Sequence, residues 1–221
     1  MGNERHLSAC ILANGEYQHE ERLLGIVKQV HLLIAADGGA NWLARHELAP
    51  DILVGDMDSV DEGVKNSVEK HGGRLVMAKR EKDETDLELA LLEAVAMHAE
   101  KITILGAFGG RVDHALANVC LLAMPALRGV DVRLYDGITF LWLAIARTEI
   151  HGEPGDLVSL IPLGRDAHGV RTSGLQYALH GETLRFGPAR GMSNVLTEPV
   201  ATVEVGLGEL LVAHTPRDDR E

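Results

Sequence analysis

Short apolar runs, each followed by an acidic residue, recur through the first two thirds of this chain of 221 residues. The runs are residues 32–36 before Asp37, 52–55 before Asp56 and Asp58, 102–105 before Asp113, and 132–135 before Asp136. Runs rich in Val, Ile and Leu between helical patterns are typical of buried parallel strands, whose ligands bind beyond the strands' carboxyl ends. We therefore expect several acids at one rim of a sheet, where a divalent metal ion or a cationic ligand can hold them together.

Strand-like and helical patterns alternate up to residue 136, which predicts an open parallel sheet flanked by helices, a Rossmann-like α/β fold. The predicted strands are residues 7–13, 30–36, 51–54, 74–78, 102–105 and 130–135, and the predicted helices lie near 20–28, 39–47, 60–71, 86–99 and 113–125. The helix over 86–99 shows the clearest apolar face, made of Leu87, Ala90, Leu91, Ala94, Val95 and His98.

After Asp136 the helical patterns stop, and short β-like runs separated by Gly, Pro and Asp take over. These runs are residues 139–143, 157–161, 169–179, 182–186, 201–205 and 209–214. Regularly spaced short strands with turn signals indicate a small antiparallel sandwich or barrel. We therefore expect two domains, residues 1–140 and 141–221.

Composition excludes several classes of function. The net charge of −12 and the aromatic content of 4% argue against a nucleic-acid partner, which needs basic stripes or aromatic platforms. No apolar run approaches the ~20 residues that span a bilayer, and the polar residues 1–6 do not form a signal peptide. Cys10 and Cys120 both lie in apolar stretches, so we expect them to be buried in a cytoplasmic protein.

Asp56 and Asp58 follow the third predicted strand and are two residues apart. In an irregular turn both carboxylates can reach one ion, and Mg²⁺ prefers such hard oxygen ligands. The alternative is helix capping, because residues 59–62 match a capping box with Ser59 as its cap. We favour an ion-binding role for Asp56 and a capping role for Ser59.

Residues 81–86 place four acids around Lys82. Thr85 is expected to cap the following helix, and the helix dipole accounts for one nearby acid. The remaining acids would repel a phosphate at this helix N-terminus unless a cation bridges them, and Lys82 or a metal ion can do so. The pattern favours a functional role for Asp86 and leaves function and capping evenly weighted for Asp83.

A glycine-rich stretch, residues 106–110, leads to Arg111, Asp113 and His114. Glycines let a backbone approach a ligand closely, and Arg111 offers a bidentate fork for phosphate. Asp113 also stands where a helix N-cap is expected. Asp37 lies at another strand end, where it could bind a ribose hydroxyl, a metal ion or the backbone of Gly38 in its own turn.

These motifs, taken in order, resemble thiamine pyrophosphokinases. The matching stretches are Asn14-Gly15, residues 37–41, 55–59, 82–86 and 109–114, then 172–179 and 191–194. Each motif is weak by itself, but together they cover nearly the whole chain. The resemblance implies an α/β catalytic domain, a C-terminal β-sandwich that helps bind thiamine, and a homodimer with the thiamine site near the subunit interface. It also implies transfer of pyrophosphate from ATP to the hydroxyl of thiamine, with Mg²⁺ and release of AMP.

The resemblance assigns roles to individual residues. The implied metal and catalytic acids are Asp56, Asp58 and Asp86, with Asp113 a further catalytic acid; the implied ATP contacts are Asp37, Lys82, Asp83, Thr85 and Arg111; and the implied thiamine contacts are Asp113, Ser193 and Asn194. Either Asp86 or Asp113 would accept the hydroxyl proton. A lysine at position 82 is similar to the bacterial branch of the family, whereas members of the eukaryotic type often have Gln at this position. An aromatic residue expected after the Ser-Asn pair is replaced by Val195.

Three alternatives share parts of this pattern. A pyrophosphokinase for another hydroxymethyl compound, such as a pterin, would use the same acids, but residues 172–175 and 193–194 favour thiamine. A nucleotide or thiamine diphosphate sensor would favour basic residues over this dense set of acids. A metal-dependent phosphohydrolase would need no acceptor.

Overall fold

The computed structural model describes residues 7–79 and 81–217, so the polar residues 1–6 discussed above lie outside it. The chain divides into two compact units, one ending at Gly137 and the other beginning at Ile138. Among the described residues, no helix is long and apolar enough to cross a membrane.

The first unit is built on a parallel sheet with strand order β6-β5-β1-β2-β3-β4. Its strands are β1 (Ser8–Leu12), β2 (Leu32–Ala36), β3 (Ile52–Gly55), β4 (Arg74–Met77), β5 (Lys101–Leu105) and β6 (Asp131–Tyr135). Its helices are α1 (Glu20–Val27), α2 (Gly39–Arg45), α3 (Glu62–Lys70), α4 (Asp86–Ala96) and α5 (Val112–Leu121), with a 3₁₀ turn η1 (Pro125–Leu127). The predicted α/β fold is confirmed.

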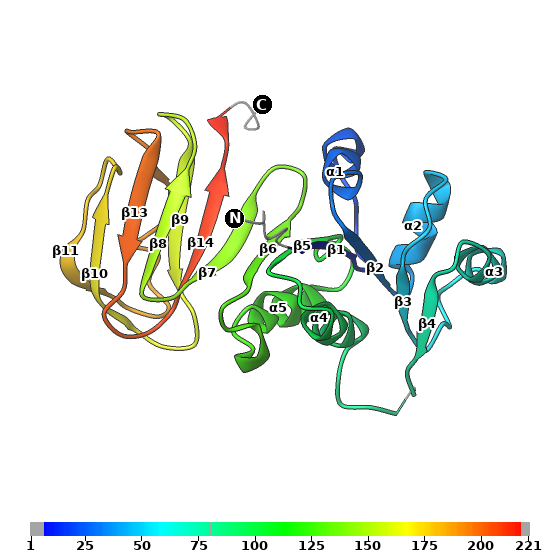
Figure 1. Cartoon of the computed structure of the whole chain (residues 1–221). Helices are drawn as coiled ribbons and strands as arrows, with labels where there is room; N and C mark the ends of the chain where they lie inside the picture. Colours follow the sequence, from blue (N-terminus) through cyan, green and yellow to red (C-terminus); the bar gives the residue numbers. More distant parts are fainter. Residues whose placement is uncertain (1–6, 80, 218–221) are drawn as a thin grey trace, which may run out of the picture. The chain divides into compact units, whose positions relative to one another are not determined.

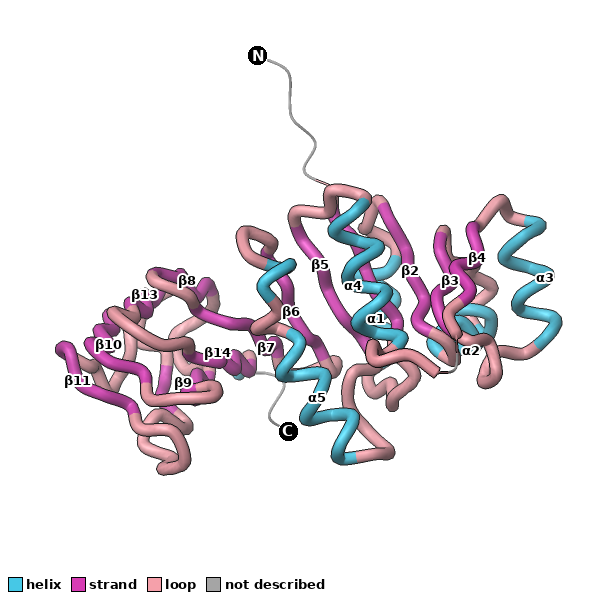
Figure 2. Tube along the Cα trace, turned by 90° about the horizontal axis from the view of Figure 1, so that it is seen from below, coloured by secondary structure: helices cyan, strands magenta, loops and turns pink. Residues whose placement is uncertain are grey.

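Helices cover both faces of this sheet. Figure 1 shows α1 and α2 on one face and α4 and α5 on the other, and in Figure 2, seen from below, α4 and α5 lie in front of the strands. The chain runs from β1 outward to β4 and then returns to β5 on the other side of β1. This reversal between β1 and β5 is a topological switch point, where open parallel sheets bind their ligands.

Helix α4 buries the face that its periodicity predicts, because Leu87, Ala90, Leu91 and Ala94 are all at most 5% exposed. The helix ends at Ala96, earlier than predicted. His98 was expected on this buried face but is exposed, with a left-handed backbone at φ 62°. The chain turns there toward β5, so the helical period no longer decides where the side chain lies.

Of the two predicted helix caps, Thr85 is confirmed and Ser59 is wrong, and the alternative of a cap at Asp113 is not observed. Thr85 caps α4 as expected, since its hydroxyl accepts a hydrogen bond from the Glu88 N–H at 3.2 Å. Helix α3 is preceded by Asp61 instead of Ser59, and α5 is preceded by Arg111, which puts Asp113 inside the first turn. Cys120 on α5 is also exposed, whereas Cys10 is buried as predicted.

The second unit contains two antiparallel sheets, with strand orders β11-β10-β13-β8 and β12-β9-β14-β7. The strands are β7 (Phe140–Ala144), β8 (Arg147–His151), β9 (Leu157–Pro162), β10 (Ala167–Ser173), β11 (His180–Leu184), β12 (Asn194–Val195), β13 (Val200–Glu204) and β14 (Leu210–Thr215). Both sheets contribute buried aliphatic residues to a shared core, with Trp142, so the predicted sandwich is confirmed.

The sequence missed two of these strands. Strand β8 has a single buried residue, Ile150, and its other positions are polar or partly exposed, so an apolar run is absent. Strand β12 is only two residues long. Both are recognised only through their pairing, β8 with β13 and β12 with β9.

Candidate active site

A cavity of about 850 Å³ lies in the first unit, among the loops that follow the carboxyl ends of β1, β2, β3 and β5. It occupies the switch point between β1 and β5. The predicted residues that line it are Asp37, Asp56, Asp58, Lys82, Thr85, Asp86 and Arg111. Asp83 and Asp113 are not among its lining residues. The chain reversal therefore gathers most of the predicted site from four separate segments, which follow β2, β3, β4 and β5.

Three carboxylates form the centre of the cavity. Asp37, Asp56 and Asp58 each place one oxygen within 4.8 Å of the others. Met57 between the two later acids has φ 65°, and Asp37 has φ 46°. Left-handed backbone at non-glycine residues costs about 1–3 kcal/mol and is concentrated at functional sites. The irregular turn brings Asp56 and Asp58 to the same side, as the sequence predicted for a shared ion.

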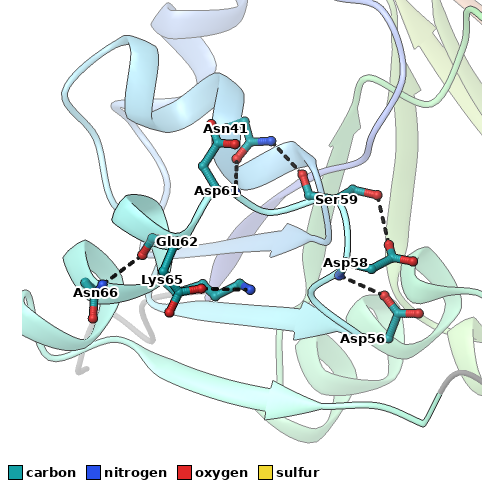
Figure 3. A network of polar contacts seen from close by, with 8 residues as sticks. All are labelled: Asn41, Asp56, Asp58, Ser59, Asp61, Glu62, Lys65 and Asn66. Carbon is teal, nitrogen blue, oxygen red and sulfur yellow. Dashed lines mark hydrogen bonds and ion pairs between the residues drawn. The ribbon is translucent and has the colours of Figure 1, made fainter.

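The loop that carries these acids is held by hydrogen bonds from a neighbouring helix (Figure 3). Asn41 of α2 donates to the Ser59 carbonyl at 2.8 Å and accepts from the Asp61 N–H at 3.1 Å. Within the loop, the Asp58 N–H donates to Asp56 Oδ1 at 3.1 Å, and the Ser59 hydroxyl donates to Asp58 Oδ1 at 3.1 Å. Ser59 therefore orients an acid of the cluster and does not cap a helix.

Asp37 is the most buried member of the cluster, at 7% exposed. Its Oδ1 atom is buried and has no hydrogen-bond partner. Burial raises the pKa of Asp37, and the nearby carboxylates of Asp86 and Asp58 raise it further. A buried carboxylate oxygen without a partner is costly in free energy, so this position suits a cation.

Lys82 and Asp86 form an ion pair at the N-terminus of α4. The Lys82 ammonium lies 2.5 Å from Asp86 Oδ1, and the two side chains are 16% and 29% exposed. Asp86 was expected as a metal ligand beside Asp56 and Asp58. In the structure Asp37 takes the third place in the cluster, and Asp86 is held by lysine.

Arg111 and Asp113 form a bidentate ion pair beside the glycine-rich loop, with contacts of 3.1 and 2.5 Å. The hydrogen bond from Arg111 is the main cause that lowers the pKa of Asp113 to about 2. Asn118 of α5 supports the loop by donating to the Ala107 carbonyl at 2.7 Å. Asn118 also lines the cavity and was not predicted, because its role depends on the loop conformation.

The loop after β1 also lines the cavity, through Asn14, Gly15 and Glu16, which the sequence did not assign to a site. A Cβ atom on Gly15 would lie 2.2 Å from the Phe108 carbonyl oxygen, so only glycine fits there. The Glu16 N–H donates to the same carbonyl at 2.7 Å. The Asn14-Gly15 pair was the one sequence signal for this part of the site, but the same pair is equally typical of an ordinary turn.

The predicted residues Ser193 and Asn194 lie in the second unit. Asn194 is 7% exposed, and its side chain bonds to the backbone of Tyr177: Oδ1 accepts from the Tyr177 N–H at 2.9 Å, and Nδ2 donates to the Tyr177 carbonyl at 2.9 Å. Ser193 is exposed, with φ 55°. Asn194 therefore fixes the backbone of Tyr177, a residue that is 64% exposed.

The two units match the two domains of one known family. Residues 24–134 match the thiamin pyrophosphokinase catalytic domain, and residues 147–210 match the thiamin pyrophosphokinase vitamin B1 binding domain. Thiamine pyrophosphokinase from Bacillus subtilis is 29% identical over 204 residues, which is 91% of this chain and 95% of that protein. Thiamine pyrophosphokinase 1 from Arabidopsis thaliana is 31% identical over 201 residues, 78% of this chain and 74% of that protein.

The fold agrees with these matches. The crystal structure of the Bacillus subtilis thiamine pyrophosphokinase superposes with a TM-score of 0.83 at 27% identity, covering 95% of this chain and 99% of that one. Family, relatives and fold thus point the same way as the acid-lined cavity. The chain therefore belongs to the thiamine pyrophosphokinase family, and it is an enzyme that transfers pyrophosphate from ATP to thiamine to make thiamine diphosphate.

Proposed function

We propose that the cavity of the first unit binds ATP with Mg²⁺ and is the place where pyrophosphate transfer occurs. The observation that carries this proposal is the unpartnered buried oxygen of Asp37 beside Asp56 and Asp58. Three carboxylates with hard oxygen ligands suit Mg²⁺, which usually takes one or two carboxylates together with phosphate oxygens and water. When bound, Mg²⁺ neutralises charge on the triphosphate that these acids would otherwise repel.

The remaining cavity residues supply positioning. Arg111 has the planar fork that matches phosphate oxygens, and Lys82 is a second cation at the cavity wall. Asp37 and Thr85 are proposed to contact the nucleotide as well, and so is Asp83, which precedes Thr85 by two residues. The thiamine hydroxyl then forms a bond to the β-phosphorus in line while the bridging bond to the α-phosphate breaks and AMP leaves. Asp86 or Asp113 accepts the hydroxyl proton.

We further propose that Ser193 and Tyr177 of the second unit contact thiamine. Asp113 of the first unit is proposed separately as a thiamine contact, on its charge alone. A carboxylate suits the fixed positive charge of thiamine, and an aromatic ring suits its flat heterocycles. The hydrogen bonds of Asn194 go to the backbone, so Asn194 acts by holding Tyr177 in place. Tyr177 would then supply the aromatic surface that is missing at Val195.

A homodimer is also proposed. Val112, Leu116 and Cys120 are spaced four residues apart on α5 and share one face, with Val112 73% and Leu116 64% exposed. This exposed apolar stripe lies next to the cavity residues Arg111 and His114, and a second copy of the chain would cover it. We propose a cytoplasmic location, in keeping with the free thiols of Cys10 and Cys120.

Replacing Asp56 tests the metal-dependent reaction. With ATP and Mg²⁺, AMP release should require thiamine and should match thiamine diphosphate in amount, and Asp56→Asn should lower kcat by about 100-fold or more. Asp61→Asn is the matched control, because Asp61 lies on the same loop and its side chain does not cap α3. Equal turnover in the two variants would rule out the proposed role of Asp56, and release of AMP without thiamine would indicate a hydrolase.

The raised pKa of Asp37 predicts how stability depends on pH. Asp37 binds its proton more tightly in the folded protein than in the unfolded chain, so its contribution to stability is present at low pH and is lost as pH rises through the raised pKa. Without Mg²⁺, Asp37→Asn should therefore unfold at a higher temperature than wild type at pH 8, and the gap should close near pH 4. Added Mg²⁺ should raise the Tm of wild type more than that of the variant. A variant less stable than wild type at pH 8 would contradict the proposal.

The role of Tyr177 is tested by steady-state kinetics. Tyr177→Ala should raise the KM for thiamine about tenfold, the loss expected for one stacked ring, while the KM for ATP stays unchanged. Tyr177→Phe should keep the wild-type value because the ring remains. Phe186→Ala removes another exposed aromatic ring of the second unit, 57% exposed, and should leave both constants unchanged. A similar KM for thiamine in the Tyr177→Ala and Phe186→Ala variants would contradict the stacking role.

The mass in solution tests the dimer. Light scattering should give the wild type twice its chain mass of 23.9 kDa, and Leu116→Asp should shift it toward the monomer because a charge would be buried in the interface. Leu207→Asp makes the same change at a leucine that is 60% exposed in the second unit. This control should remain dimeric. A monomeric wild type at micromolar concentration, or dissociation by both variants, would count against the α5 interface.

A further inference from the structure

Lys82 occupies a position that disfavours a cation. It lies just before α4, and the positive end of a helix dipole is at its N-terminus, where anions are stabilised and cations are not. The side chain is nevertheless largely buried, at 16% exposed, with its ammonium 2.5 Å from Asp86 Oδ1. The carboxylate of Asp86 must therefore offset two unfavourable free energies, that of burying the ammonium and that of its repulsion by the helix dipole.

Asp86 is close to the proposed metal site. A Cβ atom placed on Gly55 would lie 3.3 Å from Asp86 Oδ1 and 3.2 Å from the Cβ atom of Asp37. The charge of Asp86 also raises the pKa of Asp37. The Asp86 oxygen nearest to Gly55 is the same atom that Lys82 contacts. Asp86 could thus extend the cluster of Asp37, Asp56 and Asp58, but its inward oxygen is occupied by lysine.

We propose that Lys82 withholds Asp86 from the metal site until a polyphosphate chain enters the cavity, when the ammonium moves to a phosphate and releases the carboxylate. This inference rests on the metal site proposed above. Lysine suits such an exchange because its ammonium is a compact charge on a flexible stem with three donors, which is not tied to one planar geometry. Its side chain lines the cavity, so an incoming phosphate can reach it.

The exchange gives Asp86 different roles before and after nucleotide binding. Without nucleotide, the ion has only Asp37, Asp56 and Asp58 as carboxylate ligands and feels the positive charge of Lys82, so it binds weakly. With nucleotide, the phosphate oxygens attract the ammonium, and Asp86 becomes available to the ion or to the substrate hydroxyl. Metal and nucleotide would then enter the cavity together.

The first test is a titration of the protein with Mn²⁺ in the absence of nucleotide. Electron paramagnetic resonance measures the free ion at each step. Lys82→Met should bind Mn²⁺ about tenfold more tightly than wild type, the factor expected for freeing one charged ligand. Lys82→Gln should behave in the same way, and Lys82→Arg, which keeps the charge, should match wild type. Lys65→Met is the matched control, because Lys65 pairs with Glu62 at the start of α3 at 3.4 Å. It should leave the affinity unchanged.

A double-mutant cycle separates release of Asp86 from simple loss of a positive charge. If Lys82→Met acts by freeing Asp86, adding Asp86→Asn should reverse the tighter binding, whereas Asp86→Asn alone should change Mn²⁺ affinity by less than about twofold. Tight binding that persists in the double variant would overturn the inference. So would equal affinity in wild type and Lys82→Met. If neither protein binds Mn²⁺, the proposed metal site itself is wrong.

Discussion

The cavity of the first unit is dominated by electrostatic repulsion among carboxylates that the fold holds close together. Parallel strands end at one rim, and the reversal between β1 and β5 opens that rim into a cavity, so Asp37, Asp56 and Asp58 are brought within 4.8 Å of one another. Without a cation this arrangement is unfavourable: burial is the main cause that raises the pKa of Asp37, and the charges of Asp86 and Asp58 raise it further. The fold of the sheet bears this cost because the strands beneath it are almost entirely aliphatic and buried. A bound cation would relieve the repulsion.

The sequence predicts this rim well because strand ends and acids are both visible as local patterns. It could not predict which three acids lie closest together. Asp37 joins the cluster through a left-handed backbone at φ 46°, and Asp86 is drawn aside by Lys82 at 2.5 Å. Both facts depend on contacts between segments distant from one another or on backbone strain. The capping signals at Ser59 and Asp113 failed for a related reason, since both side chains bond to other groups of the site.

In the second unit, the strands that could be predicted from the sequence are those with buried aliphatic residues. Strands with alternating buried aliphatic residues, such as β9, were visible in the sequence, whereas the mostly polar β8 was not. The aromatic residue expected after Ser193 and Asn194 is absent from that segment, but Asn194 bonds to the backbone of an exposed aromatic residue, Tyr177. This pairing between the segment before β11 and the segment at β12 is a contact that a linear motif does not reveal.

The contact between the loops after β1 and β5 has a consequence for how such a chain can diverge. Gly15 lies so close to the carbonyl oxygens of Phe108 and Gly106 that a Cβ atom would come within 2.2 and 2.3 Å of them, and a Cβ atom on Gly109 would come within 2.4 Å of the Glu16 side chain. Neither loop can acquire a side chain or a new length unless the other moves with it. The two loops therefore constitute a single unit of evolutionary change, although nearly a hundred residues separate them in the sequence. New specificity at this cavity would arise more readily in the loops that do not share this contact.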